Sequence, residues 1–185
     1  EWTFALDERR AHRWHATLDI SGHASTPIFE RAVLDESGTQ ALSDLLTSLL
    51  PGWNIESIEI NRRDLARSRI GILLSVKPIV TDIEVLLTTM IQSPSAWYAQ
   101  SKKDLFADHD LPRSFVLKMP MSSQWSNRTK GRIEVPGGRI MLNPIQVKQD
   151  WQLVLTAELV DPPAFMNADK SGILARILKH LRGAK

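Results

Sequence analysis

Alternation of apolar and polar residues near the N-terminus is the feature that most constrains the fold. Four apolar residues share one parity there: Trp14, Ala16, Leu18 and Ile20. A period of two residues is typical of a β-strand with one buried face and one wet face. The pattern recurs at residues 70–76 and 151–159. The chain is therefore predicted to be rich in β-structure.

Composition narrows the class of protein. The 185 residues include 43% hydrophobic and 24% charged residues, a balance that suits one domain or two small lobes. There is no cysteine, which excludes disulfides, thiolate nucleophiles and Cys-ligated metals. The chain starts at Glu1 rather than Met, so we expect a processed form or an excised fragment.

Charge and hydropathy make two classes of partner unexpected. The net charge is only +2, whereas a general nucleic-acid binder usually carries a large basic excess. No apolar run approaches the roughly 18 residues that a membrane span requires. We therefore expect no nucleic-acid binding and no membrane insertion.

Two helices are predicted from leucine and isoleucine spacing. Residues 39–50 place five leucines on one stripe, and Pro51-Gly52 ends that helix. Residues 169–182 form the second helix, with Asp169 as N-cap and Gly183 just past the end. This terminal helix is amphipathic and basic, so it could lie on a membrane surface. Its narrow apolar stripe favours docking on its own domain.

Further strands are predicted on both sides of a long loop. Residues 53–60 form a strand whose apolar parity shifts between Ile55 and Ile58, which indicates a bulge or a change of sheet. A charged connector and the strand 69–80 follow. The apolar run 83–91 is ambiguous and is interpreted as a strand. Residues 93–112 show no period and are predicted to form a loop.

The C-terminal half also favours β-structure. Strands are predicted at 114–119, 131–135, 139–143, 145–148 and 151–160. Pro136-Gly137-Gly138 is a hairpin turn, because strand rather than helix follows it. The fold class is therefore α+β: mainly antiparallel β in sandwich-like layers, with one packed helix and one C-terminal helix. We expect an N-terminal β lobe at 1–111 and a C-terminal lobe at 112–185, or one continuous domain.

Two clusters of polar side chains in the sequence contain groups that can act as metal ligands or catalysts. His12 and His15 lie three apart, so on a strand they face opposite sides and cannot share one metal ion. Asp104, Asp108 and His109 group carboxylates and an imidazole in the predicted loop. The sequence supplies no nucleophile beside them, and an exposed loop is the simpler interpretation. We expect no catalytic residue, no cofactor and no metal site.

Six tryptophans are many for a chain of this length, and they lie both in predicted strands and in predicted loops. Trp14 and Trp151 fall on the core parity of their strands. Trp97, Tyr98 and Trp125 fall in predicted loops, where aromatic side chains bind glycans or peptides or else cap the edge of the core. These three residues are the candidate binding site.

The order of elements supports a family resemblance. The helix ending in Leu50-Pro51-Gly52 is followed by the strand 53–60, the segment Pro112–Pro120, a Gly-Arg hairpin, a proline-rich stop and a terminal helix. This order resembles the C-terminal β domain that follows the papain-like core in bacterial transglutaminase-like proteins of unknown function. The resemblance covers nearly the whole chain. In that family a Cys-His-Asp core precedes the domain, and none of its catalytic residues has a counterpart here.

The resemblance implies a non-catalytic accessory or interaction domain of such a protein, located in the periplasm or cell envelope. Its partner would be the catalytic core of a parent protein or another protein. Two alternatives stay open. One is a carbohydrate- or peptide-binding module that uses the three loop aromatics, and the other is a hydrolase that uses the Asp104, Asp108 and His109 loop.

Overall fold

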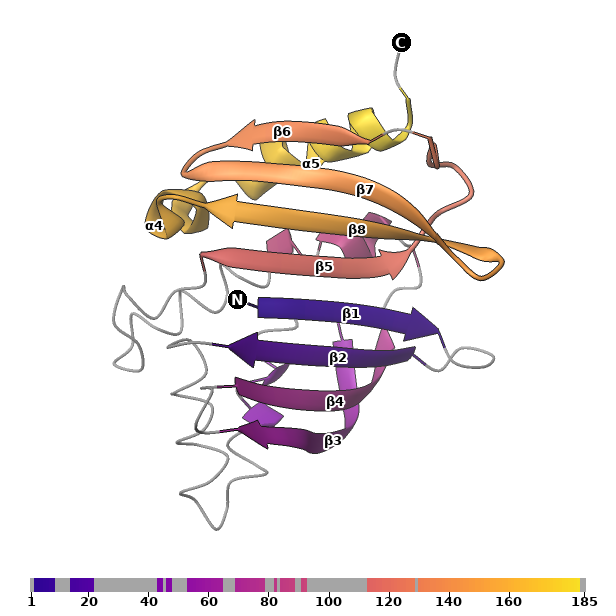
Figure 1. Cartoon of the computed structure of the whole chain (residues 1–185), viewed down its shortest axis with the longest axis vertical. Helices are drawn as coiled ribbons and strands as arrows, with labels where there is room; N and C mark the ends of the chain where they lie inside the picture. The colour runs from indigo at the N-terminus through magenta and orange to yellow at the C-terminus, as the bar shows by residue number, and fades with distance from the viewer. Residues whose placement is uncertain are drawn as a thin grey trace.

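The computed structural model of the chain shows one broad sheet with helices packed on one side of it (Figure 1). It describes residues 2–8, 14–21, 43–44, 46–47, 53–64, 69–78, 82, 84–88, 91–92, 113–128 and 130–183.

The strands form a single eight-stranded sheet in the order β3-β4-β2-β1-β5-β8-β7-β6. Their bounds are β1 Trp2–Glu8, β2 Trp14–Ser21, β3 Trp53–Asp64, β4 Arg69–Pro78, β5 Ser114–Pro120, β6 Gly131–Val135, β7 Gly138–Val147 and β8 Asp150–Leu159. β1 and β5 pair in parallel, with Phe4 beside Leu117, and every other neighbouring pair is antiparallel. The prediction of an α+β fold with mainly antiparallel strands is confirmed.

The arrangement of the strands differs from the predicted sandwich-like layers. The β1–β5 pair joins strands of the two halves edge to edge, so the layers are one sheet and its helices rather than two stacked sheets. A period of two residues shows that a strand has one buried face. It does not show which strand lies beside it, and for that reason the sequence could not distinguish the two arrangements.

Register aligns the buried positions of successive strands on one face. On β4 these are Ile72, Leu74 and Val76, which are nearly inaccessible to solvent. In the second half Leu117, Leu155 and Leu142 are direct cross-strand neighbours and all are buried. Burial of such side chains stabilises the fold by roughly 1.5–3 kcal/mol each.

The predicted irregularity in β3 is confirmed. Register shifts occur between Ile55 and Ser57 and between Ile60 and Arg62. The first shift places Ile55 opposite Val76 and Ile58 opposite Leu74, so both isoleucines lie on the buried face although their spacing is odd. The strand also runs to Asp64, through residues that we expected in a connector.

Residues 84–88 and 91–92 are helical, so the strand predicted over 83–91 is wrong. The Asp82 carboxylate accepts hydrogen bonds from the backbone N–H of Glu84 (2.8 Å) and Val85 (3.4 Å), as an N-cap does. The Thr88 hydroxyl donates to the Glu84 carbonyl (2.8 Å) one helical turn back. A threonine in this segment is therefore compatible with a helix and does not require a strand.

Buried side chains attach these helical segments to the core. Leu86, Leu87 and Ile91 are at most 2% exposed. Leu46, in the helix predicted over 39–50, is fully buried; residues 43–44 and 46–47 are helical, and the rest of that helix lies outside the described residues. Both segments therefore belong to the layer that covers the sheet.

Two further helices close the chain. α4 Pro162–Asn167 begins after the N-cap Asp161, and α5 Lys170–Leu181 begins after the predicted N-cap Asp169. The buried residues of α5 are Ile173, Ile177 and Leu181, so the helix docks on its own domain as predicted. Gly183 ends it with a left-handed φ of 62°.

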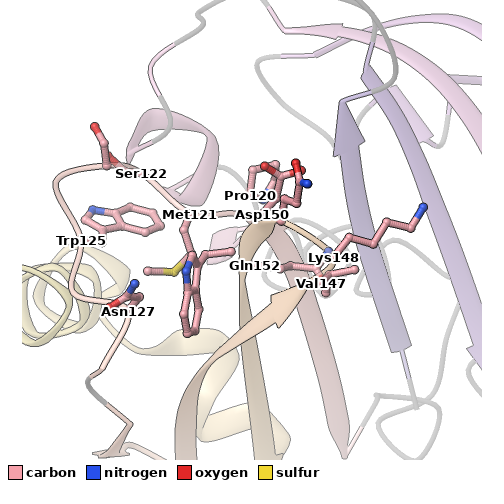
Figure 2. A pocket seen from close by; sticks show the side chains of 12 residues that line it. Pro120, Met121, Ser122, Trp125, Asn127, Val147, Lys148, Asp150 and Gln152 are labelled. Carbon is pink, nitrogen blue, oxygen red and sulfur yellow. The ribbon is translucent and has the colours of Figure 1, made fainter.

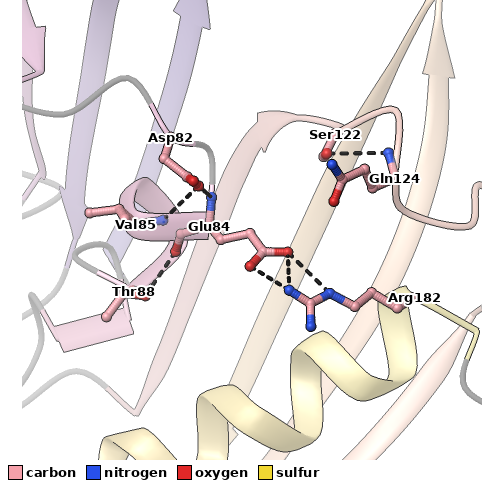
Figure 3. Close-up of polar contacts among 7 residues, drawn as sticks. All are labelled: Asp82, Glu84, Val85, Thr88, Ser122, Gln124 and Arg182. Carbon is pink, nitrogen blue, oxygen red and sulfur yellow. Dashed lines mark hydrogen bonds and ion pairs between the residues drawn. The ribbon is translucent and has the colours of Figure 1, made fainter.

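An ion pair links the helices of the two halves. Arg182, the C-cap of α5, donates to both carboxylate oxygens of Glu84 at 2.6 Å (Figure 3). The hydrogen bonds to Glu84 raise the pKa of Arg182 above its usual value. Because the guanidinium is largely solvated, the pair orients the helices more than it stabilises the fold.

Candidate functional site

A cleft opens at the end of the sheet where β5 and β7 end and β8 begins (Figure 2). Its volume is about 710 Å³, within the range of small-molecule and oligomer sites. One wall is the loop 121–128 that follows β5, and the other is the β7–β8 hairpin. The lining residues are Pro120, Met121, Ser122, Ser123, Trp125, Asn127, Val147, Lys148, Gln149, Asp150, Trp151 and Gln152.

Backbone pairing holds the two walls together. Pro120 lies opposite Gln152 at the end of the β5–β8 ladder. One residue further on, the Met121 N–H donates to the Trp151 carbonyl at 3.0 Å. The floor of the cleft is therefore a continuation of the sheet.

The loop wall is anchored into the core by Trp125. Its side chain is 5% exposed and belongs to the main apolar cluster. The backbone N–H of Trp125 donates to the Ser122 carbonyl (3.1 Å), and the backbone N–H of Ser126 donates to the Leu181 carbonyl at the end of α5 (2.7 Å). These contacts give the loop a fixed shape.

The indole Nε1 of Trp125 is buried and has no hydrogen-bond partner among the described residues. A buried donor without a partner lowers folding stability by about 1–3 kcal/mol. Most buried polar groups in folded proteins are therefore hydrogen-bonded. Trp125 thus combines a structural role with an indole N–H that no described residue accepts.

The hairpin wall contains a strained residue. Lys148 and Gln149 form the turn between the paired residues Val147 and Asp150. Lys148 has φ of 59°, a conformation that favours glycine and costs a side chain of this kind on the order of 1–3 kcal/mol. Strained residues of this type cluster at binding sites, and this one lines the cleft.

The predicted site residues have different outcomes. Trp125 lines the cleft and also caps the edge of the core, as the simpler interpretation held. Trp97 and Tyr98 lie outside the described residues, as do Asp104, Asp108, His109 and His12. For His15 the structure describes the backbone in β2 and not the side chain.

Trp151 is the site residue that the sequence analysis missed. Its parity assigned it to the core, but it is only partly buried and lines the cleft. The sequence feature that could have indicated its exposure was its position at the start of a predicted strand, directly after a turn. Side chains at a strand end lack neighbours on one side, whereas those in mid-strand are covered.

The described residues contain neither a membrane-spanning helix nor a group of metal ligands. No helix there is both long enough and apolar enough to cross a bilayer. In the same part of the chain no three His, Asp or Glu side chains are grouped as metal ligands would be. The cleft is lined by aromatic, amide, hydroxyl and charged side chains, which suits reversible binding.

Comparisons of the chain with protein-family models, curated protein sequences and solved structures give no match.

Proposed function

We propose that this chain is a non-catalytic interaction module that binds its partner in the cleft between the loop 121–128 and the β7–β8 hairpin. The observation that carries the proposal is the left-handed Lys148 at the wall of this cleft. A lysine there costs folding free energy that glycine or asparagine would avoid, and a binding role for the hairpin accounts for it.

The construction of the two walls supports this function. The loop is fixed by Trp125 and by the hydrogen bond from Ser126 to the end of α5, so binding does not have to order it. The other wall presents the partly exposed indole of Trp151 beside polar side chains. Aromatic residues in a preformed concave surface are characteristic of recognition sites.

Site-specific photocrosslinking in the cells that produce the chain tests the proposal. A photoreactive p-benzoylphenylalanine replaces Lys148 at the cleft, and in a control variant it replaces Arg132, an exposed residue on β6. We expect adducts of higher mass from the cleft position and not from the control. Adding Trp151→Ala should reduce their yield. Equal yields at the two positions, or none at the cleft, would contradict the proposal.

The resemblance in the order of elements supports a second, broader part of the proposal: the module is an accessory part of a bacterial transglutaminase-like protein in the periplasm or cell envelope. Its test is the mass and cell fraction of the native polypeptide recognised by an antibody against this chain. A Cys-containing papain-like core on the same polypeptide is the expected result. A native polypeptide without such a core, or one in the cytoplasmic fraction, would refute it.

A further inference from the structure

The chemistry of the cleft defines the class of ligand. We infer that the cleft binds a neutral oligosaccharide, with a sugar ring against the indole of Trp151 and ring hydroxyls bonded to the polar wall. This inference rests on the proposed function of the cleft, and it adds the chemical nature of the bound partner.

The cleft combines aromatic side chains with neutral polar groups. Trp125 and Trp151 line the same cleft, and Trp151 is the more exposed of the two. One face of a pyranose ring presents mainly C–H groups, which pack on an aromatic surface, while its edge presents hydroxyls. An amphipathic ligand of that shape suits an indole next to polar side chains.

Most of the hydrogen-bonding side chains in the lining are neutral. Five lining residues carry a neutral amide or hydroxyl: Ser122, Ser123, Asn127, Gln149 and Gln152. Each of these side chains both donates and accepts, as a sugar hydroxyl does. Carboxylate or phosphate ligands would instead select for several donors without acceptors.

The formal charges of the lining residues balance. The lining contains one cation, Lys148, and one carboxylate, Asp150, two positions apart on the same hairpin. Their opposite charges largely offset each other for a ligand in the cleft. A polyanion would meet a carboxylate beside the only lysine of the lining, so a neutral chain is favoured.

Strand pairing argues against an extended peptide. Recognition of a peptide by strand addition needs a free strand edge. At the cleft β8 is paired on both sides, since Gln152 lies opposite Pro120 of β5 and opposite Ile145 of β7. In the described part of the chain the outer edge of β7 is unpaired over residues 143–147, but Pro144 offers no N–H there and only Val147 of this stretch lines the cleft. Side chains rather than backbone groups must therefore hold the ligand.

Binding of defined probes to the isotope-labelled chain tests this inference. The probes are the hexasaccharides of β-1,4-linked glucose and N-acetylglucosamine, an acidic hexagalacturonate and a proline-rich decapeptide. The indole Nε1–H signals of Trp125 and Trp151 report where each probe binds, and calorimetry gives its affinity. The variants are Trp151→Ala and the matched pair Gln149→Ala and Gln124→Ala, two exposed glutamines of which only Gln149 lines the cleft.

A neutral hexasaccharide should shift the Trp151 indole signal. Its affinity should fall at least about tenfold with Trp151→Ala, about threefold or more with Gln149→Ala, and stay within about twofold with Gln124→Ala. Gln149→Ala is an exposed turn variant, so it keeps the test valid if Trp151→Ala does not fold. A cleft that binds only the peptide or only the acidic probe would overturn the saccharide inference and leave the interaction function standing. A hexasaccharide that shifts neither indole would overturn the inference, and photocrosslinking at Lys148 then decides the function separately.

Discussion

Replacing Phe165 by alanine should be among the most destabilising single changes in the C-terminal half. Phe165 is fully buried, although it lies on a helix of only six residues. Its ring contacts that of Phe115 at 5.4 Å between centroids, with 48° between the planes. The ammonium of Lys170 lies 4.5 Å from the ring centroid and donates to the Phe165, Met166 and Ala168 carbonyls at the end of α4.

The expected loss in the free energy of unfolding follows from these contacts. Truncation of a buried phenylalanine costs about 3–5 kcal/mol through lost transfer free energy and the cavity left behind. The aromatic pair contributes about 0.5–1.5 kcal/mol beyond its buried area. Phe165→Leu keeps most of the apolar volume, so it should lose about 1–2 kcal/mol and rank between wild type and Phe165→Ala.

Urea unfolding followed by tryptophan fluorescence measures both variants. With a slope of about 1–3 kcal/mol/M, Phe165→Ala should lower the midpoint by at least about 1 M while the slope stays unchanged. Val160→Ala is the control, because Val160 is 89% exposed close to the same corner and should change stability by less than about 0.5 kcal/mol. A loss below about 1 kcal/mol for Phe165→Ala would refute the packing argument.

Three further predictions concern the helices. Leu46→Ala should cost about 2–5 kcal/mol in urea unfolding if the buried position is core; an unchanged midpoint would show that the helix does not pack on the sheet. Hydrogen bonds from the Ser171 hydroxyl and from the backbone N–H of Ser171 and Gly172 lower the pKa of Asp169 below its usual 3.8. The ionised carboxylate therefore stabilises the fold above pH 3.8, and this contribution is lost as the pH falls through the lowered pKa. Asp169→Ala should therefore lower the thermal midpoint at pH 6, and the difference from wild type should shrink on acidification; a difference independent of pH would contradict this. Truncation after Asp169 removes the buried side chains of Ile173, Ile177 and Leu181, whose burial stabilises the fold by roughly 5–9 kcal/mol together. The truncated chain should therefore lose cooperative unfolding, and the full chain should not sediment with anionic vesicles. Vesicle binding by the full chain, together with a stable truncated chain, would show that α5 is a membrane anchor.

Periodicity predicted the elements whose two faces see different environments. In β2 and β4 the alternating residues lie in register, with Leu18 opposite Ile72, so the pattern and the pairing agree. In α5 the apolar stripe and Asp169 predicted both the buried face and the start of the helix. These signals are local, because each depends only on one element and the face that it buries.

Three elements were missed or misassigned, and two of them lack a one-sided pattern. β1 at Trp2–Glu8 was not predicted, although its alternation resembles that of β2. Residues 84–92 carry threonine and valine, which favour strands, and the decisive signal was the Asp82 cap rather than composition. α4 was missed because two prolines follow Asp161, and proline fits the first turn of a helix as readily as a strand end.

The cleft could not be predicted because it arises where the sheet becomes incomplete. β6 pairs with β7 only as far as Leu142, so residues 143–147 of β7 extend beyond their neighbour. Pro144 fits this overhang, since the pairing places its nitrogen, which has no hydrogen to donate, on the side that β6 has left. Trp151 lies on the next strand, opposite Gln146 of this overhang, and the anchored loop forms the opposite wall of the cleft. A sequence period reports which face of a strand is buried, whereas a cleft of this kind depends on where a neighbouring strand stops.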